Sequence, residues 1–126
     1  MNQKAFITVL EDVPWTVSEH NPGLQYKLLI DASRQDTDGF SFGILKLAPG
    51  AVLCPHHHDP QESYFILEGE ALMHLNDAEQ EVGPGSVIYI PRAHLHGITN
   101  TGSEPLVFIW TFPTDTWSEV EYHYRK

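Results

Sequence analysis

Short hydrophobic runs, separated by turn-forming residues, dominate the pattern along the chain. Nine glycines and nine prolines punctuate runs that contain only a few hydrophobic residues each. Such runs with regular turn signals are typical of an all-β sandwich or barrel, because strands need fewer residues than helices do. We therefore expect strands at residues 26–30, 40–47, 63–67, 71–75, 87–90 and 106–112.

Two segments near the C-terminus differ from this pattern. Residues 106–112 are hydrophobic almost throughout, which indicates a strand that is buried on both faces. In the tail, residues 113–126, Thr116 and Glu119 have the spacing of a helix-capping box. This helical signal is weak, and an irregular tail fits the sequence equally well.

The length and composition indicate one globular domain. The chain has 126 residues, of which 41% are hydrophobic and 19% are charged. A chain of this size can bury a sizeable core without disulfides or structural metals. Since no linker, repeat or low-complexity tract interrupts the sequence, we expect a single domain spanning residues 1–126.

Charge and cysteine content narrow the set of partners. The formal net charge of −10 argues against binding to nucleic acid or to anionic membranes, and its simplest role is solubility. The single cysteine, Cys54, cannot form an internal disulfide, which fits a reducing compartment. The N-terminal residues 1–10 lack a signal-peptide pattern, and no apolar stretch approaches the ~18 residues of a membrane span. We expect a cytoplasmic protein.

Histidines are concentrated in two short segments. His56 and His58 lie two residues apart, so on a strand they point to the same side, and Glu62 follows after a turn at Pro60. The second segment carries His96. Imidazole and carboxylate groups together suit a divalent transition metal. Taken alone, however, a His-x-His pair is more often a solvated polar turn.

Three neighbouring residues have less specific interpretations. His57 has the opposite parity to His56 and should face solvent. His94 lies in a turn, where it is either a partner of the site or a plain loop residue. Cys54 has the parity of His56, so we expect a small packing residue that faces the barrel interior.

The spacing of these residues resembles the two sequence motifs of the cupin superfamily. The first motif runs from Gly50 to Gly69 and matches at every position, and the second runs from Gly85 to Asn100. One position departs from the second motif, since Ala93 stands where the family usually has glycine. The resemblance implies a jelly-roll barrel, also called a double-stranded β-helix. It further implies one metal ion with four ligands: His56, His58, Glu62 and His96.

The sequence leaves the metal and the assembly state open. Iron, manganese, nickel, zinc and cobalt all accept three imidazoles and one carboxylate, and availability often decides which is bound. Small cupins are commonly dimers, so we expect a homodimer whose N-terminal segment could pair across the interface. The expected ligand is a small molecule, with a carboxylate favoured.

Two tyrosines and several aromatic residues surround the metal motifs. Tyr64 stands two residues after Glu62 and should share its inward face. A tyrosine near a dication can lose its proton well below its usual pKa of ~10 and act as a base. The alternative is a core tyrosine whose hydroxyl is hydrogen-bonded. The other strand aromatics should mostly fill the core: Phe40, Phe42, Tyr89, Phe108, Trp110 and Phe112.

Beyond the metal motifs, the chain resembles the small single-domain dimethylsulfoniopropionate lyases of the cupin type. The similar stretches are NPGLQYKLLIDAS, GFSFG, APG, the metal motif through Glu62-Ser63-Tyr64, and the tail FPTDTWSEVEY. Those enzymes release dimethyl sulfide and acrylate by metal-assisted elimination. The resemblance implies that Tyr64 is the base and that Tyr122 belongs to the pocket.

Two other classes of function remain open at this point. Three histidines and one glutamate also serve Fe(II)-dependent dioxygenases in other cupins, and some cupins bind sugars or small ligands without catalysis. A lyase needs a base such as Tyr64, whereas a dioxygenase depends more on open metal positions, and a binding module needs neither.

Overall fold

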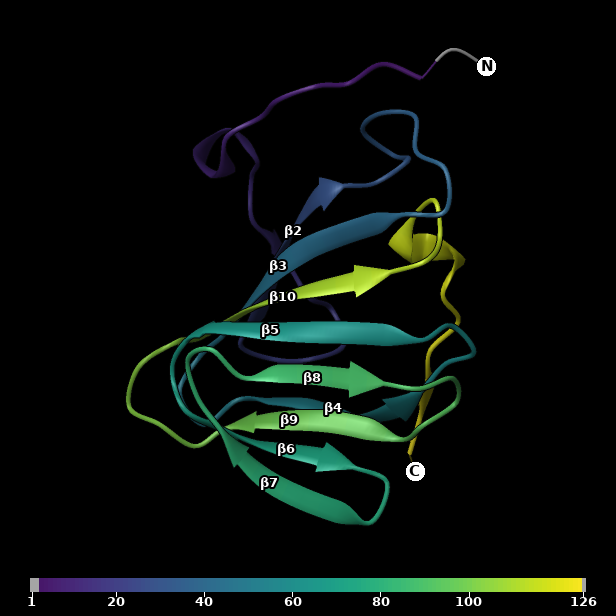
Figure 1. Cartoon of the computed structure of the whole chain (residues 1–126). Coiled ribbons are helices and arrows are strands. Elements are labelled where there is room, and N and C mark those ends of the chain that lie inside the picture. The colour runs from purple at the N-terminus through teal and green to yellow at the C-terminus, as the bar shows by residue number, and fades with distance from the viewer. Residues whose placement is uncertain (1–2, 126) are drawn as a thin grey trace.

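Two antiparallel β-sheets face each other and enclose the core (Figure 1). The computed structural model describes residues 3–125. The six-stranded sheet has the order β1 (Thr16–Val17), β2 (Leu24–Ile30), β3 (Ser41–Leu47), β10 (Leu106–Phe112), β5 (Glu62–Glu68), β8 (Val87–Ile90). The five-stranded sheet has the order β11 (His123–Tyr124), β4 (Val52–His57), β9 (His96–Asn100), β6 (Ala71–Leu75), β7 (Ala78–Val82). Two 3-10 turns complete the chain, η1 (Leu10–Asp12) and η2 (Trp117–Glu119).

The prediction of an all-β jelly roll is confirmed. All six expected strands are present, and their ends differ from the expected ones by no more than two residues. The expected strands did not include β4 and β9, which carry the metal-motif histidines His56 and His96. The sequence also did not indicate β7, because its residues are mostly polar or charged and exposed. The two-residue strands β1 and β11 are too short to produce any alternation of hydrophobic and polar positions.

Alternation along β5 shows how the strands position the site. Glu62, Tyr64 and Ile66 are buried, whereas Phe65 between them is 45% exposed. Successive side chains of a strand point to opposite faces, so one face of β5 lines the interior and the other faces outward. The same strand therefore carries a core residue, a tyrosine and a carboxylate toward the inside of the barrel.

Burial on the outer face differs from the sequence expectation. In β10, Phe108 and Phe112 are buried in the core, but Ile109 and Thr111 on the outer face are only half-buried. The expectation of a strand buried on both faces is therefore only partly met. The expectation that the strand aromatics are mostly core is wrong for two residues, since Phe40 is 45% exposed and Tyr89 is 59% exposed.

Two turns show why the motif positions require special backbone conformations. Gly69 has φ of 91°, and a Cβ at this position would lie 2.7 Å from the carbonyl oxygen of Pro105. Ala93, at the position where glycine is usual, also has a positive φ, of 61°. Its N–H donates to the carbonyl of His58 at 2.9 Å, so this turn connects the two metal-motif segments.

The C-terminal tail folds back along the barrel (Figure 1). It contains one turn of 3-10 helix, η2, whose N-cap is Thr116, as the capping signal suggested. The buried carboxylate of Asp31 accepts hydrogen bonds from the Thr116 hydroxyl at 2.6 Å and from the Trp117 N–H at 2.9 Å. Strand β11 then pairs with β4, so the tail is attached to both sheets.

Candidate metal centre and adjoining pocket

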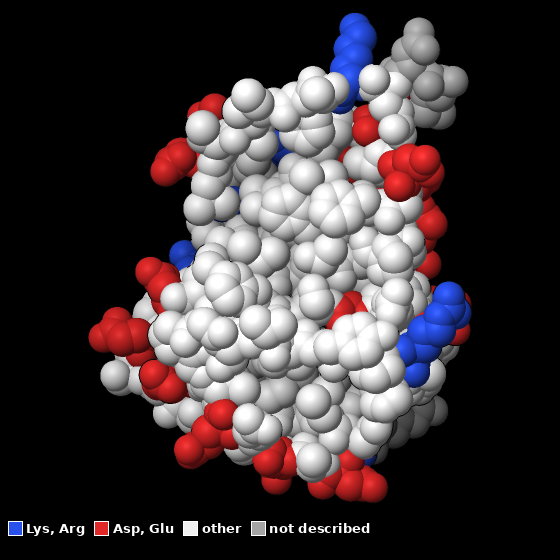
Figure 2. Space-filling view, in the orientation of Figure 1, with Lys and Arg blue, Asp and Glu red and all other residues white. Residues whose placement is uncertain are grey.

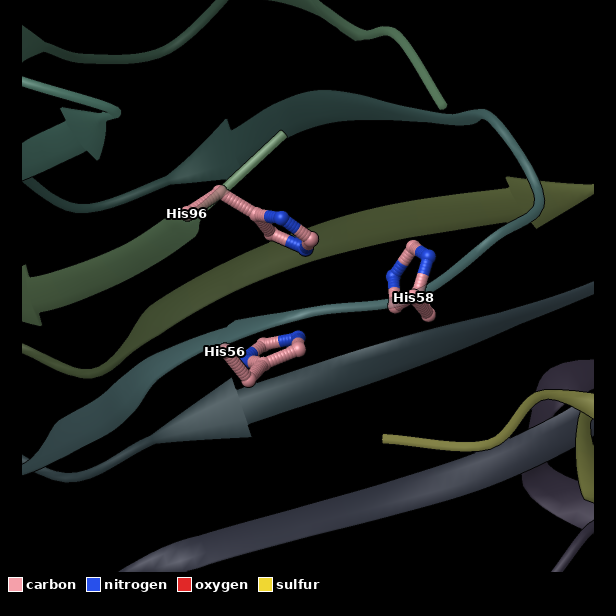
Figure 3. Close-up of side chains that lie close together, drawn as sticks. All are labelled: His56, His58 and His96. Carbon is pink, nitrogen blue, oxygen red and sulfur yellow. The ribbon is translucent and has the colours of Figure 1, made fainter. Parts of the chain in front are cut away.

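Three histidines and one glutamate converge inside the barrel, and we call this group the cradle. His56 lies in β4, His58 follows the end of that strand, His96 begins β9 and Glu62 begins β5; all four are buried. The three imidazoles point toward one another (Figure 3), with ligand atoms within 4.8 Å of each other. The Glu62 carboxylate lies beside two of them, its Oε1 being 3.1 Å from His58 Nε2.

Backbone carbonyls fix the orientation of each imidazole. The Nδ1 atoms of His56 and His58 lie 2.8 Å from the carbonyl oxygens of Cys54 and Pro60, respectively. His96 Nδ1 lies 2.9 Å from the carbonyl of His94. A carbonyl can only accept a hydrogen bond, so each Nδ1 carries the proton and each Nε2 of a neutral ring presents a lone pair. Such contacts are what hold metal-binding histidines in position.

The inward-facing atoms call for a cation between them. Glu62 Oε1 is 3.1 Å from His58 Nε2 and 3.2 Å from His96 Nε2. His96 Nε2 is buried without a partner in hydrogen-bonding geometry, despite this short distance. A carboxylate facing lone pairs is repulsive unless a proton or a metal ion lies among them. The donor set of nitrogen and oxygen atoms fits a divalent transition metal.

Burial shapes the protonation of the cradle. Burial, helped by the neighbouring His96, lowers the pKa of His56 to about 4, so this ring is neutral at neutral pH. Burial tends to raise the pKa of Glu62, but the close imidazoles of His58 and His96 outweigh it, and the pKa lies below its ordinary value. A neutral imidazole and an ionised carboxylate are the forms that bind metals.

A β-bulge in β4 places His56 in the cradle and corrects our expectation for Cys54. The pairing of β4 with β9 shifts register between Leu53 and His56, so both side chains are buried although they lie three residues apart. Simple alternation from His56 therefore fails at Cys54, which is half-buried and not a core residue. Its carbonyl holds His56, and its N–H donates to Asn21 Oδ1 at 3.2 Å.

The remaining motif histidines lie outside the cradle. His57 is exposed, as predicted, and stacks on His123 of β11 with ring centroids 4.9 Å apart. The imidazole of His94 is half-buried in the turn, and the residue contacts the site through its carbonyl, which accepts from His96. His94 therefore supports the site through its backbone.

A pocket of about 340 Å³ adjoins the cradle. His56 and Glu62 form part of its wall, with Tyr64 beside them. A second part of the wall, here called the terminal wall, is built from both ends of the chain: residues 16–21 from the N-terminal side, and Trp117, Tyr122 and Tyr124 from the tail. No lysine or arginine is found among the described residues that line it. The pocket is therefore aromatic and acidic in character.

The structure brings both predicted tyrosines to the pocket. The Tyr64 ring packs on Phe108 with centroids 4.3 Å apart, and the Tyr122 ring lies 4.9 Å from His56. Within the described part of the chain, neither hydroxyl has a hydrogen-bond partner. Burial, and then the Glu62 carboxylate, raise the pKa of both tyrosines well above the usual value of 10, so both are neutral phenols here.

Sequence reasoning missed part of the pocket wall. Tyr124 lies 5.4 Å from His56 and stacks on His20 at 3.8 Å, measured between ring centroids. Tyr26 contacts Trp117 of the tail at 5.4 Å. The only available signal was the two-residue spacing of the tail tyrosines. On an extended segment this spacing puts both rings on one face, and the pairing of β11 with β4 places them beside His56.

The fold and the cradle together define the class of protein. A family model described as a cupin domain matches residues 43–112, which is more than half of the 126-residue chain. The chain therefore belongs to the cupin family. Among residues 3–125, no helix has the length and apolarity needed to cross a membrane.

Individual relatives have different activities. The chain is 31% identical over 101 residues to the dimethylsulfoniopropionate lyase DddW of Ruegeria pomeroyi, covering 80% of this chain and 66% of the lyase. It is 30% identical over 113 residues to a glucose-6-phosphate isomerase of Thermococcus litoralis, covering 79% of this chain and 59% of the isomerase. The chain thus spans about three-fifths to two-thirds of the length of these relatives.

A solved structure supports the fold at greater coverage. The polyketide cyclase RemF of Streptomyces resistomycificus superposes with a TM-score of 0.85 over 98% of this chain and 87% of the cyclase. The two sequences are 23% identical, so the likeness concerns the fold alone. Because one fold supports several reactions, the activity has to be argued from the pocket.

Proposed function

We propose that this cupin is a metal-dependent lyase that cleaves dimethylsulfoniopropionate to dimethyl sulfide and acrylate. The observation that carries the proposal is an aromatic and acidic pocket that opens directly onto the cradle. The substrate has a carboxylate at one end and a sulfonium at the other. The pocket offers a matching environment for each end.

The cradle is the proposed site for the carboxylate end. Its four residues would hold one divalent transition metal, which would polarise the bound carboxylate and acidify the adjacent C–H bond. Neutral His56 and ionised Glu62 provide the required ligand forms. Burial of all four side chains keeps water from competing for the site.

The aromatic wall is the proposed site for the sulfonium end. Tyr26 lies between Trp110 and Trp117, with ring centroids 6.3 Å and 5.4 Å away. Aromatic faces attract onium groups through their quadrupoles. Glu19 lies at the edge of the same pocket and adds negative charge. A cation at this wall is therefore stabilised by both the rings and the carboxylate.

A tyrosine is the proposed base, and Tyr64 is the first candidate. As a phenolate, its oxygen would take the proton from the carbon next to the carboxylate, and the tyrosine would become a phenol. The electron pair of the broken C–H bond would form the double bond of acrylate. The C–S bond would break, and its electron pair would leave with neutral dimethyl sulfide. In the protein alone Tyr64 is neutral, so this role requires positive charge in the cradle.

The pocket disfavours a phosphorylated sugar, the class of substrate named for the isomerase relative. A phosphate dianion in a protein is usually held by lysine, arginine or a helix N-terminus. The described residues that line the pocket include Glu19 and Glu62 but no basic side chain. A phosphate outside the cradle would face the Glu19 carboxylate, with no basic side chain in the described lining to compensate.

The proposal is tested by measuring gas-phase dimethyl sulfide from purified protein. Samples loaded separately with Fe, Mn, Ni, Zn or Co receive dimethylsulfoniopropionate, and headspace chromatography follows the sulfide while liquid chromatography follows acrylate. We expect equal amounts of both products with at least one metal. Absence of both products in every fully loaded sample contradicts the proposal, and oxygen consumption with another substrate would favour a dioxygenase.

A further inference from the structure

The bulge in β4 leaves three backbone groups without partners in the sheet. Cys54 and Pro55 lie between Leu53 and His56, the residues of β4 that flank the register shift, and neither has a partner residue on β9. Proline has no N–H, so the bulge offers one donor, the N–H of Cys54, and two acceptors, the carbonyls of Cys54 and Pro55. Backbone polar groups inside a fold need partners, and here the partners must come from outside the ladder.

Each of these three groups has a partner in a different part of the molecule. The Cys54 carbonyl accepts a hydrogen bond from His56 Nδ1 at 2.8 Å. The Pro55 carbonyl accepts from the N–H of Arg125 in the tail at 3.0 Å. The Cys54 N–H donates to Oδ1 of Asn21 at 3.2 Å. Asn21 therefore holds the residue whose carbonyl fixes a cradle imidazole.

The loop between β1 and β2 keeps Asn21 in this position. Its N–H donates to Ser18 Oγ at 3.1 Å, and its carbonyl accepts from the N–H of Leu24 at 3.2 Å. Gly23 has φ of 81°, and a Cβ at this position would lie 2.9 Å from the Cβ of Ala51, so the loop packs directly against the segment before β4. Asn21 is only 3% exposed, so it is buried where the loop meets this strand.

Asn21 also contacts the tail part of the terminal wall. Burial raises the pKa of the Tyr124 phenol, and a hydrogen bond with the Asn21 side chain partly opposes this rise. A hydrogen bond lowers the pKa of a phenol when the phenol oxygen accepts it, which makes Nδ2 of Asn21 the donor. The neighbouring His20 stacks on the Tyr124 ring with centroids 3.8 Å apart. One amide thus joins the bulge and the tail, and Asn21 also lines the pocket.

We infer that Asn21 is a positioning residue for the metal centre, which holds Cys54 so that the Cys54 carbonyl directs His56 Nε2 toward the metal. The inference rests on the cradle as a metal site but not on the lyase reaction. Because the bulge lies outside the ladder, loss of Oδ1 would leave the Cys54 N–H unpaired and let the carbonyl turn away from Nδ1. Losing such an outer contact of a metal-binding histidine lowers metal affinity by roughly 10–100-fold.

The test measures the dissociation constant for Zn²⁺ by competition with a chromophoric chelator, on the full chain with its fold verified by circular dichroism. Asn21→Ala should raise this Kd by roughly 10–100-fold. Asn21→Leu keeps the approximate shape of the side chain without the acceptor, and it should have the same effect. Asn21→Asp keeps an acceptor oxygen at the position of Oδ1 and should retain most of the affinity.

A spectroscopic readout separates the orientation of His56 from the charge that Asn21→Asp adds. Electron spin-echo modulation of the Cu²⁺-loaded protein reports on the remote Nδ1 of each bound imidazole. The signal of one imidazole should change in Asn21→Ala, and the wild-type signal should persist in Asn21→Asp. Acidic groups already surround the visible face of the molecule (Figure 2), and the net charge is −10, so one more carboxylate adds little general attraction for cations. Gln80→Glu adds the same charge at an exposed position of β7 and should leave the Kd unchanged.

Two further variants control for the tail contact and for a general loss of stability. Tyr124→Phe removes the hydroxyl beside Asn21 and leaves the contact with Cys54, so the Kd should not change. Asn100 is a matched buried asparagine, whose Nδ2 donates to the carbonyls of Leu47 and Glu104. Asn100→Ala should reduce the free energy of unfolding and leave the Kd of the folded protein unchanged.

Three outcomes would overturn the inference. The first is a wild-type Kd in whichever of Asn21→Ala and Asn21→Leu is folded. The second is an equal rise of the Kd in Asn100→Ala, which would show a general effect of stability. The third is an Asn21→Asp variant that binds Zn²⁺ as weakly as Asn21→Ala, since the acceptor oxygen would then have no role. None of these measurements depends on the release of dimethyl sulfide, so they remain decisive if the lyase assay fails.

Discussion

The two walls of the pocket are built in different ways. On the cradle side, the ligands stand at strand ends, and each imidazole is fixed by a backbone carbonyl two residues away. The terminal wall consists of residues 16–21 and a tail with one 3-10 turn and a two-residue strand. The cradle is thus formed by long strands, whereas the terminal wall joins the sheets only through the two-residue edge strands β1 and β11.

This difference indicates a division of roles. A metal site needs ligand positions held within fractions of an ångström, which strands with paired backbones provide. The wall that contacts the rest of a substrate can vary in sequence without disturbing the barrel, because terminal segments carry few ladder hydrogen bonds. The chemistry should therefore depend on the cradle, and the choice of substrate should depend on the terminal wall.

The largest effect is expected from removing a cradle ligand. His58→Ala and Glu62→Ala should each reduce the bound metal from about one ion per chain to a small fraction, because the remaining ligands do not complete the site. Lyase activity should fall to background. Elemental analysis and the sulfide assay measure both effects.

A matched control for the cradle prediction lies next to it. His57→Ala removes an imidazole from the same strand but on the exposed side, so metal content should stay at the wild-type level. Equal metal in the wild type and in both ligand variants would contradict the assignment of the cradle.

The next effect distinguishes the two walls directly, because each wall supplies one of the two tyrosines predicted from the sequence. Tyr64 lies on β5 and Tyr122 lies in the tail, and both line the pocket. If Tyr64 is the base, Tyr64→Phe should lower turnover by about 10²–10⁴-fold at full metal occupancy. Tyr122→Phe should change turnover less and substrate affinity more. Steady-state kinetics on metal-loaded protein separate kcat from KM.

The exposed Tyr89→Phe variant controls for the loss of a phenol in general. Near wild-type turnover of Tyr64→Phe would remove this residue from the mechanism. Because the Tyr64 hydroxyl has no hydrogen-bond partner in the described chain, the stability of Tyr64→Phe should stay close to that of the wild type. If Tyr122→Phe shows the large loss, the base belongs to the tail, and the division between the walls is wrong.

The sequence predicted which side chains meet in the cradle, but it did not predict the terminal wall. The spacing of His56, His58, Glu62 and His96 is local within two segments, and alternation along strands fixes which side chains point inward. Short strands and turns predict an all-β sandwich or barrel, and the cupin resemblance narrows this to the jelly roll. The bulge at Cys54 broke the alternation, since an inserted residue reverses it. Strands β4 and β9, which carry His56 and His96, were not among the expected strands.

The terminal wall depends on contacts between residues that are far apart in the chain. Asp31 and Thr116 form a hydrogen bond across 85 positions, and no periodicity signals such a pair. Both residues lie in stretches that resemble the lyases outside the metal motifs, DAS and TDTW. The resemblance therefore marked the correct segments but not the reason that they matter. Strand β11 has two residues, which is too short for an alternation of hydrophobic and polar positions.

A smaller effect should follow when the tail is loosened without touching the cradle. Asp31→Asn replaces a buried carboxylate that accepts from Ser33, Thr116 and Trp117. Loss of the charged acceptor should cost about 2 kcal/mol of the free energy of unfolding. Metal content should not change, whereas KM should rise by roughly tenfold because Trp117 and Tyr122 are less well positioned.

The pH dependence provides a second readout for Asp31. Burial tends to raise its pKa, but hydrogen bonds from Thr116, Ser33 and Trp117 outweigh this, and the pKa lies below the ordinary 3.8. The stabilisation is therefore present at neutral pH and is lost as pH falls below about 4. The stability difference between wild type and Asp31→Asn should shrink in that range. Asp36→Asn, at an exposed position, should show neither effect.

The smallest expected effect concerns the turn that connects the two metal-motif segments. Ala93 has φ of 61°, a conformation in which its Cβ is strained, and its N–H donates to His58. Ala93→Gly removes the strain, worth about 1 kcal/mol, but also increases the conformational entropy of the unfolded chain. The net gain should be about 0.5 kcal/mol, or an increase of roughly 2 °C in Tm.

Thermal unfolding of the metal-free protein measures this gain without a contribution from metal binding. Ala78→Gly is the matched control, because this exposed residue lies in β7 with ordinary strand geometry, and its replacement should reduce stability. The two alanine-to-glycine changes should therefore have opposite signs. If Ala93→Gly also destabilises, the unfolded-chain entropy outweighs the strain. The strain at Ala93 is then smaller than the entropy that glycine adds to the unfolded chain.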